Sequence, residues 1–136
     1  MTQEMNPCPT EAQEQTWLFQ WAETMKRLRW PELDLMYHIP NGGSRNRIEA
    51  ARFKGQGVKA GIPDVCLPVP KGGYHGLYIE MKRRKGGVVS GEQKARINQL
   101  RLQGYRVEVC RGFQAAADTI EAYMEGRLDG KGQEIL

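Results

Sequence analysis

The sequence is poor in the residues that build cysteine-based sites. It contains only three cysteines and two histidines, and it has no Cys-x-x-Cys motif. We therefore expect neither a zinc site of clustered Cys and His residues nor a disulfide framework. No apolar run approaches the roughly 20 residues of a membrane-spanning helix, and the start lacks the pattern of a signal peptide. These absences predict a protein of a reducing cytoplasm with no membrane partner, in which Cys66 and Cys110 serve as buried packing residues.

Negative charge is scarce in the middle of the chain. The segment 82–111 carries nine basic and two acidic residues, a net charge of +7, and the segment 45–59 carries +4, whereas 1–34 and 112–136 each carry −3. A basic block favours a polyanionic partner, because phosphate contacts supply most of the non-specific affinity for nucleic acids. A run of charges is often only a solvated surface, so the prediction depends on the residues beside it.

Two short apolar runs within 65–79 are joined by a turn rich in Pro and Gly, and they predict a β-hairpin. Glu80 and Lys82 follow the second run, and Asp64 precedes the first. Because side chains alternate along a strand, Glu80 and Lys82 share one face, and Asp64 can lie beside Glu80 across the pair. Paired carboxylates suit a hard cation such as Mg2+, and a nearby lysine can contact a phosphate oxygen. The pattern is typical of a nuclease.

Pro63-Asp64 followed by Glu80-Met81-Lys82 resembles the PD-(D/E)xK signature of metal-dependent nucleases. Further blocks in the same order make the likeness specific: Asn41-Gly42-Gly43, the helix from Ala50 to Gly57 with its Lys54, Ser90 with Gln93, and Gly104-Tyr105-Arg106-Val107. Together they resemble the virus-type replication-repair nuclease (VRR-NUC) family, most closely its compact stand-alone phage members. The resemblance implies an α/β fold with a restriction-endonuclease-like core, a small mixed β-sheet flanked by helices.

The same resemblance implies a Mg2+- or Mn2+-dependent DNA endonuclease that leaves a 3′-hydroxyl and a 5′-phosphate. Asp64, Glu80 and the backbone carbonyl of Met81 would bind the metal ion. Lys82 would position or deprotonate the attacking water and stabilise the charge on the phosphorane. Gln93, in the first turn of the next helix, would orient Lys82 or a phosphate.

The family also implies an acidic residue from the first helix, and two candidates are present. Thr10 and Gln13 form a capping-box pattern, and the apolar stripe of the helix that follows is centred near Trp21. At about 100° per residue, Glu14 falls almost on the midline of the stripe and Glu11 roughly 60° to its side. A carboxylate in a buried stripe needs a partner, whereas an acid in the first turn favours the helix dipole wherever it points. We predict that Glu14 holds a second metal ion or a metal-bound water, with Glu11 as the alternative.

Basic and amide side chains near the motif are expected to contact DNA. The Asn-Gly-Gly segment is either a plain turn or a loop whose amides approach a phosphate, and both readings stay open. The predicted interface combines this segment with three groups of basic residues: those that follow it up to residue 54, those of the run after Lys82, and one in the next helix. Its members are Asn41, Arg45, Arg47, Arg52, Lys54, Arg83, Arg84, Lys85 and Lys94.

The length and composition predict one domain, because 40% hydrophobic and 26% charged residues are globular values. We expect it to span 10–125, with a flexible lead at 1–9 and a flexible tail at 126–136. His38 is expected to be a packed or surface histidine. The predicted elements are a helix from Thr10 that ends before Pro31, a strand at 35–40, a helix at 45–56, hairpin strands at 65–69 and 75–79, a helix at 90–103, a strand at 105–110 and a helix at 113–124.

Three functions stay open. The compact viral members of the family resemble Holliday-junction resolvases that act as homodimers, and a C2 dimer matches the two-fold symmetry of a four-way junction. We therefore predict a homodimeric endonuclease selective for branched DNA, acting in phage replication, recombination or repair in the cytoplasm of a bacterial host. A flap or restriction-type endonuclease is the alternative. A catalytically silent DNA-binding module is disfavoured, because binding alone requires no paired acids.

Overall fold

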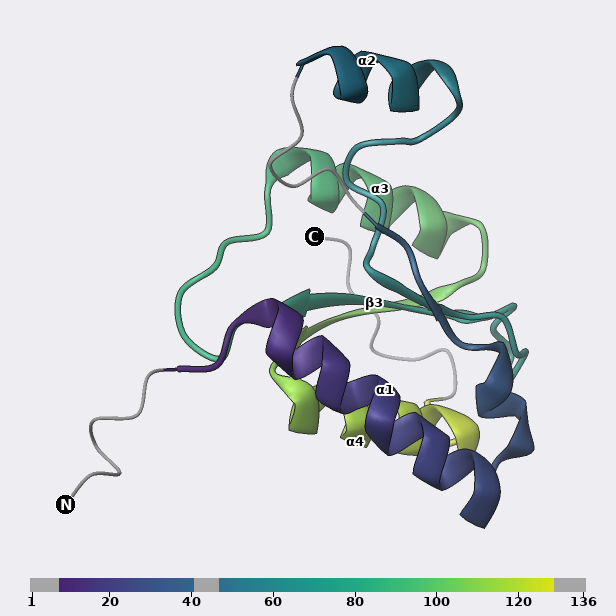
Figure 1. Cartoon of the computed structure of the whole chain (residues 1–136). Coiled ribbons are helices and arrows are strands. Elements are labelled where there is room, and N and C mark those ends of the chain that lie inside the picture. Colours follow the sequence, from purple (N-terminus) through teal and green to yellow (C-terminus); the bar gives the residue numbers. More distant parts are fainter. Residues whose placement is uncertain (1–7, 41–46, 129–136) are drawn as a thin grey trace, which may run out of the picture.

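A four-stranded β-sheet lies between two layers of helices (Figure 1). The computed structural model describes residues 8–40 and 47–128. In sheet order, the strands are β1 (Tyr37–His38), β2 (Val65–Leu67), β3 (Leu77–Lys82) and β4 (Arg106–Arg111). β2 pairs antiparallel with both β1 and β3, whereas β4 pairs parallel with β3. The mixed sheet with its flanking helices confirms the predicted α/β class.

Two helices, α1 (Glu11–Leu28) and α4 (Phe113–Met124), cover one face of the sheet, and α3 (Gly91–Leu102) covers the other (Figure 1). The short helix α2 (Arg47–Gly55) stands apart from the sheet. The main core fills the space between the sheet and the α1–α4 layer, and its buried members include Leu18, Ala22, Ile79, Met81, Ala116 and Ile120. Because side chains alternate along β3, the core takes its odd-numbered residues and leaves the even-numbered ones on the α3 face.

Two helices begin at capping boxes, and the sequence predicts the one at the start of α1. The Thr10 hydroxyl accepts a hydrogen bond from the Gln13 amide N–H at 3.1 Å, and the Gln13 side chain accepts one from the Thr10 N–H at 2.9 Å. Ser90 and Gln93 make the same reciprocal pair at the start of α3. Each box satisfies amide groups that a helix N-terminus otherwise leaves without partners.

The strand predicted at 35–40 is wrong over most of its length. A 3-10 helix, η2 (Pro31–Leu35), takes up its start, and β1 comprises only Tyr37 and His38. Proline is well placed in the first turn of a helix, where its missing N–H costs nothing. The turn buries Leu33 and leaves Leu35 exposed, so the spacing of these leucines reflects a helical turn rather than strand alternation.

The hairpin prediction is confirmed, with β2 shorter than expected. Val65 pairs with Ile79, and Leu67 pairs with Leu77.

Cys66 and Cys110 are buried free thiols, as predicted. No helix in 8–40 or 47–128 is long and apolar enough to cross a membrane.

The predicted ends of the domain fall mainly on 1–7 and 129–136, outside the described residues, as do the predicted contacts Asn41 and Arg45. Leu128, within the predicted tail, packs against the core.

Candidate active site

The motif residues meet where β3 ends, β2 begins and α3 starts. Since Val65 pairs with Ile79, Asp64 stands opposite Glu80 on the face of the sheet that α3 covers. The Asp64 Oδ2 atom accepts a hydrogen bond of 2.7 Å from the backbone N–H of Met81. The Met81 side chain is buried in the core, so only its backbone belongs to the site.

The loop before Asp64 packs tightly against the first turn of α3. Gly61 has a φ of +81°, and a Cβ at this position would lie 2.5 Å from the backbone oxygen of Glu92. Both the positive φ and the lack of space require glycine. The Arg96 Nε atom donates to the Ala60 carbonyl at 3.1 Å beside this contact. The glycine of the motif therefore holds Asp64 close to the start of α3.

Gln93 connects the two charged residues of β3. Its Nε2 atom donates to Glu80 Oε2 at 2.8 Å, and its Oε1 atom accepts from Lys82 Nζ at 3.1 Å. The Lys82 Nζ atom also lies 3.4 Å from Glu80 Oε2. Because Oε1 simultaneously accepts the Ser90 N–H at 2.9 Å, the helix cap fixes the orientation of the amide. The structure therefore brings Asp64, Glu80, Lys82 and Gln93 into one cluster.

The site holds its carboxylates at an electrostatic cost. Glu80 is 2% exposed, and burial, followed by the charge of Asp64, raises its pKa to about 7. Burial also raises the pKa of Asp64, against the hydrogen bond from Met81. Glu80 Oε1 is buried and has no hydrogen-bond partner among the described residues. A buried acceptor without a donor, next to a second carboxylate, is an environment that a cation would stabilise.

The donor set fits a divalent cation that completes its shell from outside the protein. Within the described parts of the chain, no three His, Cys, Asp or Glu side chains are grouped to hold a metal. Mg2+ is commonly bound by one or two carboxylates together with waters and substrate phosphates. Asp64 and Glu80 supply those two carboxylates, so the pair fits this ion and does not form a complete protein cage.

Glu14 does not join this cluster, contrary to the role predicted for it. It is 0% exposed, and both of its carboxylate oxygens are occupied. Oε2 accepts from Arg84 Nε at 2.7 Å, and Oε1 accepts from Arg84 Nη2 at 3.2 Å and from the Phe113 N–H at 2.9 Å. Burial by itself would raise the pKa of Glu14, but the Arg84 and Phe113 hydrogen bonds hold it below its ordinary value.

Glu11 is the acid of the first helix whose charge acts on the cluster. It is half-buried in the first turn of α1, and its charge raises the pKa of both Asp64 and Glu80. Among the described residues, the Glu11 side chain has no hydrogen-bond or ion-pair partner. The residue that the sequence ranks second is thus the acid of α1 whose charge reaches the carboxylate pair.

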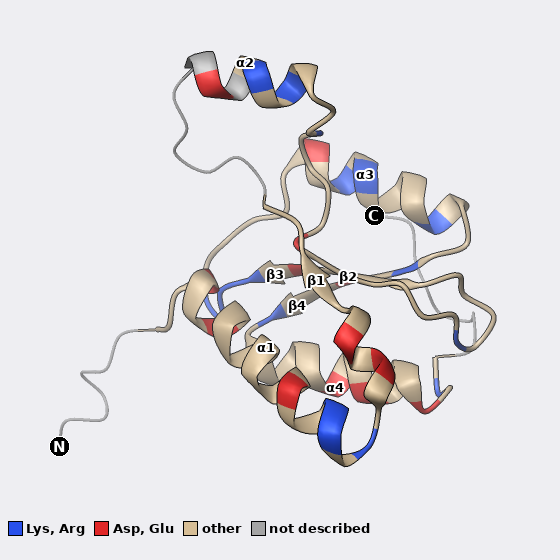
Figure 2. Ribbon diagram, turned by 45° about the vertical axis from the view of Figure 1, so that its right-hand side comes forward, with Lys and Arg blue, Asp and Glu red and all other residues tan. Residues whose placement is uncertain are grey.

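The predicted DNA contacts occupy different surroundings. Lys85 and Lys94 are exposed near the site, and Arg52 and Lys54 are exposed on α2. Arg47 begins α2. Figure 2 shows Lys and Arg along α2 and α3. Arg83 and Arg84 instead have partners within the protein, since Arg83 donates to the carbonyls of Cys8 and Pro9.

Two residues near the site were not selected from the sequence. Arg111 lies directly beside Lys82 in the β3–β4 register, is exposed, and donates to the Gly86 carbonyl at 2.6 Å. Its position at the end of a strand in the basic block is the signal that could have identified it. His38, for which both a packed and a surface position were expected, is exposed, and its Nδ1 atom lies 2.8 Å from the backbone oxygen of Asp64.

Comparison with known proteins identifies one family. Residues 9–114 match the model of the VRR-NUC domain. A solved structure described as a VRR_NUC domain protein is similar at 34% sequence identity and a TM-score of 0.75, over 88% of this chain and 92% of that one. No curated protein matches the sequence.

Proposed function

Because the chain belongs to the VRR-NUC family, we propose that it is a Mg2+- or Mn2+-dependent DNA endonuclease. The observation that carries this proposal is the pairing of Asp64, which is half-buried, with the buried Glu80, whose Oε1 atom lacks a donor, beside the ammonium group of Lys82. Two neighbouring ionised carboxylates raise the free energy of the cation-free protein, and a bound cation would offset that cost. Family membership itself indicates a nuclease that acts on DNA.

The chain's own residues divide the work of phosphodiester hydrolysis. Asp64, Glu80 and the Met81 carbonyl would hold the cation, which supplies Lewis acidity toward a phosphate oxygen when bound. Lys82, held by Gln93 at 3.1 Å, directs an N–H toward the site and stabilises the negative charge that develops on the phosphorus oxygens. Gln93 holds Lys82 and Glu80 in fixed relation, so neither side chain must reorient during the reaction.

We assign the third acidic position of the site to Glu11 rather than Glu14. Glu11 lies near enough to raise the pKa of both site carboxylates, whereas the carboxylate of Glu14 is saturated by Arg84 and Phe113. Glu11 would bind a second cation or order a water at the same cation.

The DNA backbone would run over the exposed basic residues around the pair. Lys85 and Lys94 flank the site, and Arg111 stands next to Lys82. Arg52 and Lys54 on α2 extend the same charge farther from the sheet. These contacts would provide the affinity for DNA, whereas the Asp64 and Glu80 carboxylates would serve the hydrolysis of the phosphodiester bond.

For the biological substrate we propose branched DNA, cut by a homodimer, in phage replication, recombination or repair inside a bacterial host. A four-way junction requires two cuts on symmetry-related strands, and one chain carries one site. Two sites on a C2 axis can make both cuts within the lifetime of one complex.

A cleavage assay tests the core of the proposal. End-labelled four-way junction, 5′ flap, linear duplex and single-stranded DNA are each incubated with wild type, Asp64→Asn and the matched control Asp118→Asn, which changes an exposed acid on α4. We expect Mg2+-dependent cleavage by wild type and the control, with the junction preferred. We expect at least a 100-fold loss for Asp64→Asn, with junction binding in Ca2+ retained. Equal cleavage by all three proteins would refute the site, and preference for the flap would transfer the function to a flap endonuclease.

A further inference from the structure

Glu14 and Arg84 form an ion pair that joins three elements distant in sequence. Glu14 belongs to α1, Arg84 follows the end of β3, and the third donor to the carboxylate is the first amide of α4, at Phe113. The Glu14 side chain is fully buried, while that of Arg84 remains 52% exposed. A buried carboxylate with a bidentate arginine and a backbone N–H has all its strong hydrogen bonds made by fixed partners.

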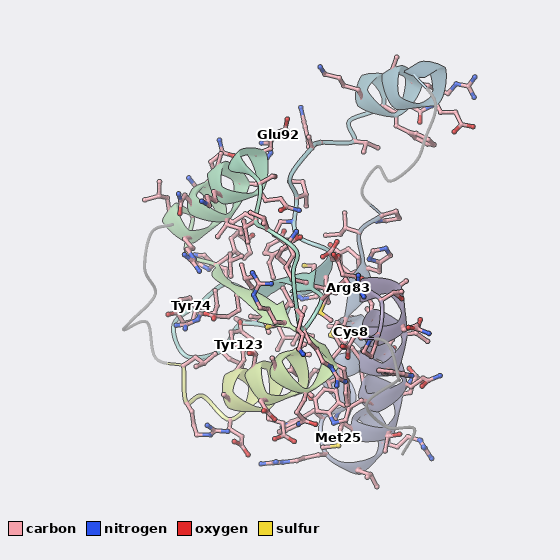
Figure 3. All side chains as sticks on the ribbon, turned by 90° about the vertical axis from the view of Figure 1, so that its left-hand side faces the viewer. Cys8, Met25, Tyr74, Arg83, Glu92 and Tyr123 are labelled. Atoms are coloured by element: carbon pink, nitrogen blue, oxygen red, sulfur yellow. The ribbon has the colours of Figure 1, made fainter. Side chains whose placement is uncertain are left out.

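The surrounding chain is shaped to admit this pair. Gly112 has a φ of +94°, and a Cβ there would lie 2.9 Å from Arg84 Cγ and 3.3 Å from Glu14 Oε2. Any other residue would therefore collide with the arginine stem in addition to adopting a strained backbone. The neighbouring Arg83 donates to the Cys8 carbonyl at 3.0 Å, and Figure 3 shows Arg83 and Cys8 side by side near the start of α1.

These contacts argue against a role for Arg83 and Arg84 in binding phosphates. If Arg84 turned toward DNA, the fully buried Glu14 carboxylate would lose its charged partner, and an unpaired buried charge is strongly destabilising. Lys85, the next residue, is exposed and has no partner among the described residues. The basic run thus divides into two residues that hold the protein together and one that is available to DNA.

The pair fixes the part of α1 that carries Glu11. Glu11 and Glu14 are three positions apart, a distance of about 4.5 Å along the helix axis. Arg84 follows Lys82 by two residues, so the ion pair ties the first turn of α1 to the strand that carries Glu80 and Lys82. We propose that Arg84, acting through Glu14, is a positioning residue that holds Glu11 against the Asp64–Glu80 pair, with Arg83 securing the chain just before the helix. The inference rests on the proposed function, because the group that Glu11 serves is the divalent cation.

The sign of the effect separates positioning from simple electrostatics. Arg84→Met removes a positive charge near a cation site. The loss of that electrostatic repulsion would by itself strengthen cation binding. Positioning predicts the opposite, a weaker affinity, by roughly 10-fold as is usual for residues that orient metal ligands. The control Lys85→Met removes the same charge one residue further along and should not weaken the affinity.

A double-mutant cycle in the absence of DNA tests the inference. Calorimetric titration with Mn2+ is performed on wild type, Glu11→Gln, Arg84→Met and the double variant. If Arg84 acts through Glu11, the double variant binds no more weakly than Glu11→Gln alone. Since Arg84→Met leaves a buried charge, the cycle is repeated with Glu14→Gln/Arg84→Met in place of Arg84→Met. This neutral pair should fold and still bind Mn2+ more weakly than wild type. Arg84→Lys, which keeps one donor, should recover part of the affinity.

Three outcomes would overturn the inference. Unchanged Mn2+ affinity in both Arg84 backgrounds would make the ion pair purely structural. Additive losses from Glu11→Gln and the Arg84 variants would show that the two residues act independently. A drop of about 0.9 in the slope of log K against log salt for DNA binding by Arg84→Met would show a phosphate contact after all. Mn2+ binding by wild type in any of these cases leaves the proposed function intact, whereas no Mn2+ binding by wild type refutes both.

Discussion

The charge of Glu80 should destabilise the apo protein at neutral and alkaline pH. Burial, and after it Asp64, raises the pKa of Glu80 from 4.5 to about 7, while Lys82 acts in the opposite direction. The folded protein thus holds this proton more tightly than the unfolded chain does. The free energy of unfolding therefore falls as pH rises from about 4.5 to about 7, and the full cost is present above that range. Glu80→Gln keeps the shape of the side chain and removes the charge at every pH.

The magnitude follows from the two pKa values. Each pKa unit corresponds to about 1.4 kcal/mol, so ionised Glu80 costs the folded state on the order of 3 kcal/mol at pH 8. At pH 5 the proton is still bound in the folded state, and the cost falls to about 1 kcal/mol by the same linkage. For a chain of this length, we expect Glu80→Gln to raise Tm by roughly 10 °C at pH 8 and by a few degrees at pH 5.

The assay is thermal and urea unfolding at pH 5 and pH 8 in EDTA. Glu32→Gln is the matched control, because Glu32 is exposed in η2, and it should leave the stability unchanged at both pH values. Mg2+ added at pH 8 should then stabilise wild type by about 2.7 kcal/mol at 100 times its Kd, and Glu80→Gln far less. Two results would refute the reasoning: a Glu80→Gln variant no more stable than wild type at pH 8, or a gain of equal size at both pH values.

Three further predictions concern catalysis, DNA binding and assembly. Glu11→Gln should reduce Mg2+-dependent cleavage by at least 10-fold with little change in Tm, whereas Glu14→Gln should lower Tm by several degrees because Arg84 loses its partner; the reverse pattern would restore Glu14 as the ligand. Arg111→Gln should weaken binding to every DNA structure and lower the salt slope by about 0.9, and an unchanged slope would show that Arg111 only supports the Gly86 carbonyl. Light scattering should give about twice the 15.5 kDa chain mass, and a cruciform plasmid should go directly to linear product; a monomer mass with accumulating nicked circles would exclude the resolvase proposal.

The sequence by itself determines the parts of this protein that depend on local rules. Strand alternation and a short turn place Asp64 beside Glu80, because an antiparallel pair with a period of two has only one register that keeps its apolar face in the core. Two capping boxes set the starts of α1 and α3 for an equally local reason, since the paired residues are three positions apart. Leu33 and Leu35 are the exception, because a short apolar run bounded by proline suits a helical turn as well as a strand.

Only the tertiary structure decides what each charged side chain contacts. The apolar stripe of α1 correctly indicates that Glu14 is buried. It cannot identify the neutralising partner, because Arg84 is 70 residues away and reaches Glu14 only when the end of β3 packs beside α1. The same packing takes Arg83 and Arg84 out of a basic run that reads as a phosphate-binding surface, and it leaves Glu11 as the acid whose charge acts on the site. Hydrogen-bonding geometry between distant segments, rather than residue type or spacing, determines which charges stabilise the fold and which remain available to a cation or to DNA.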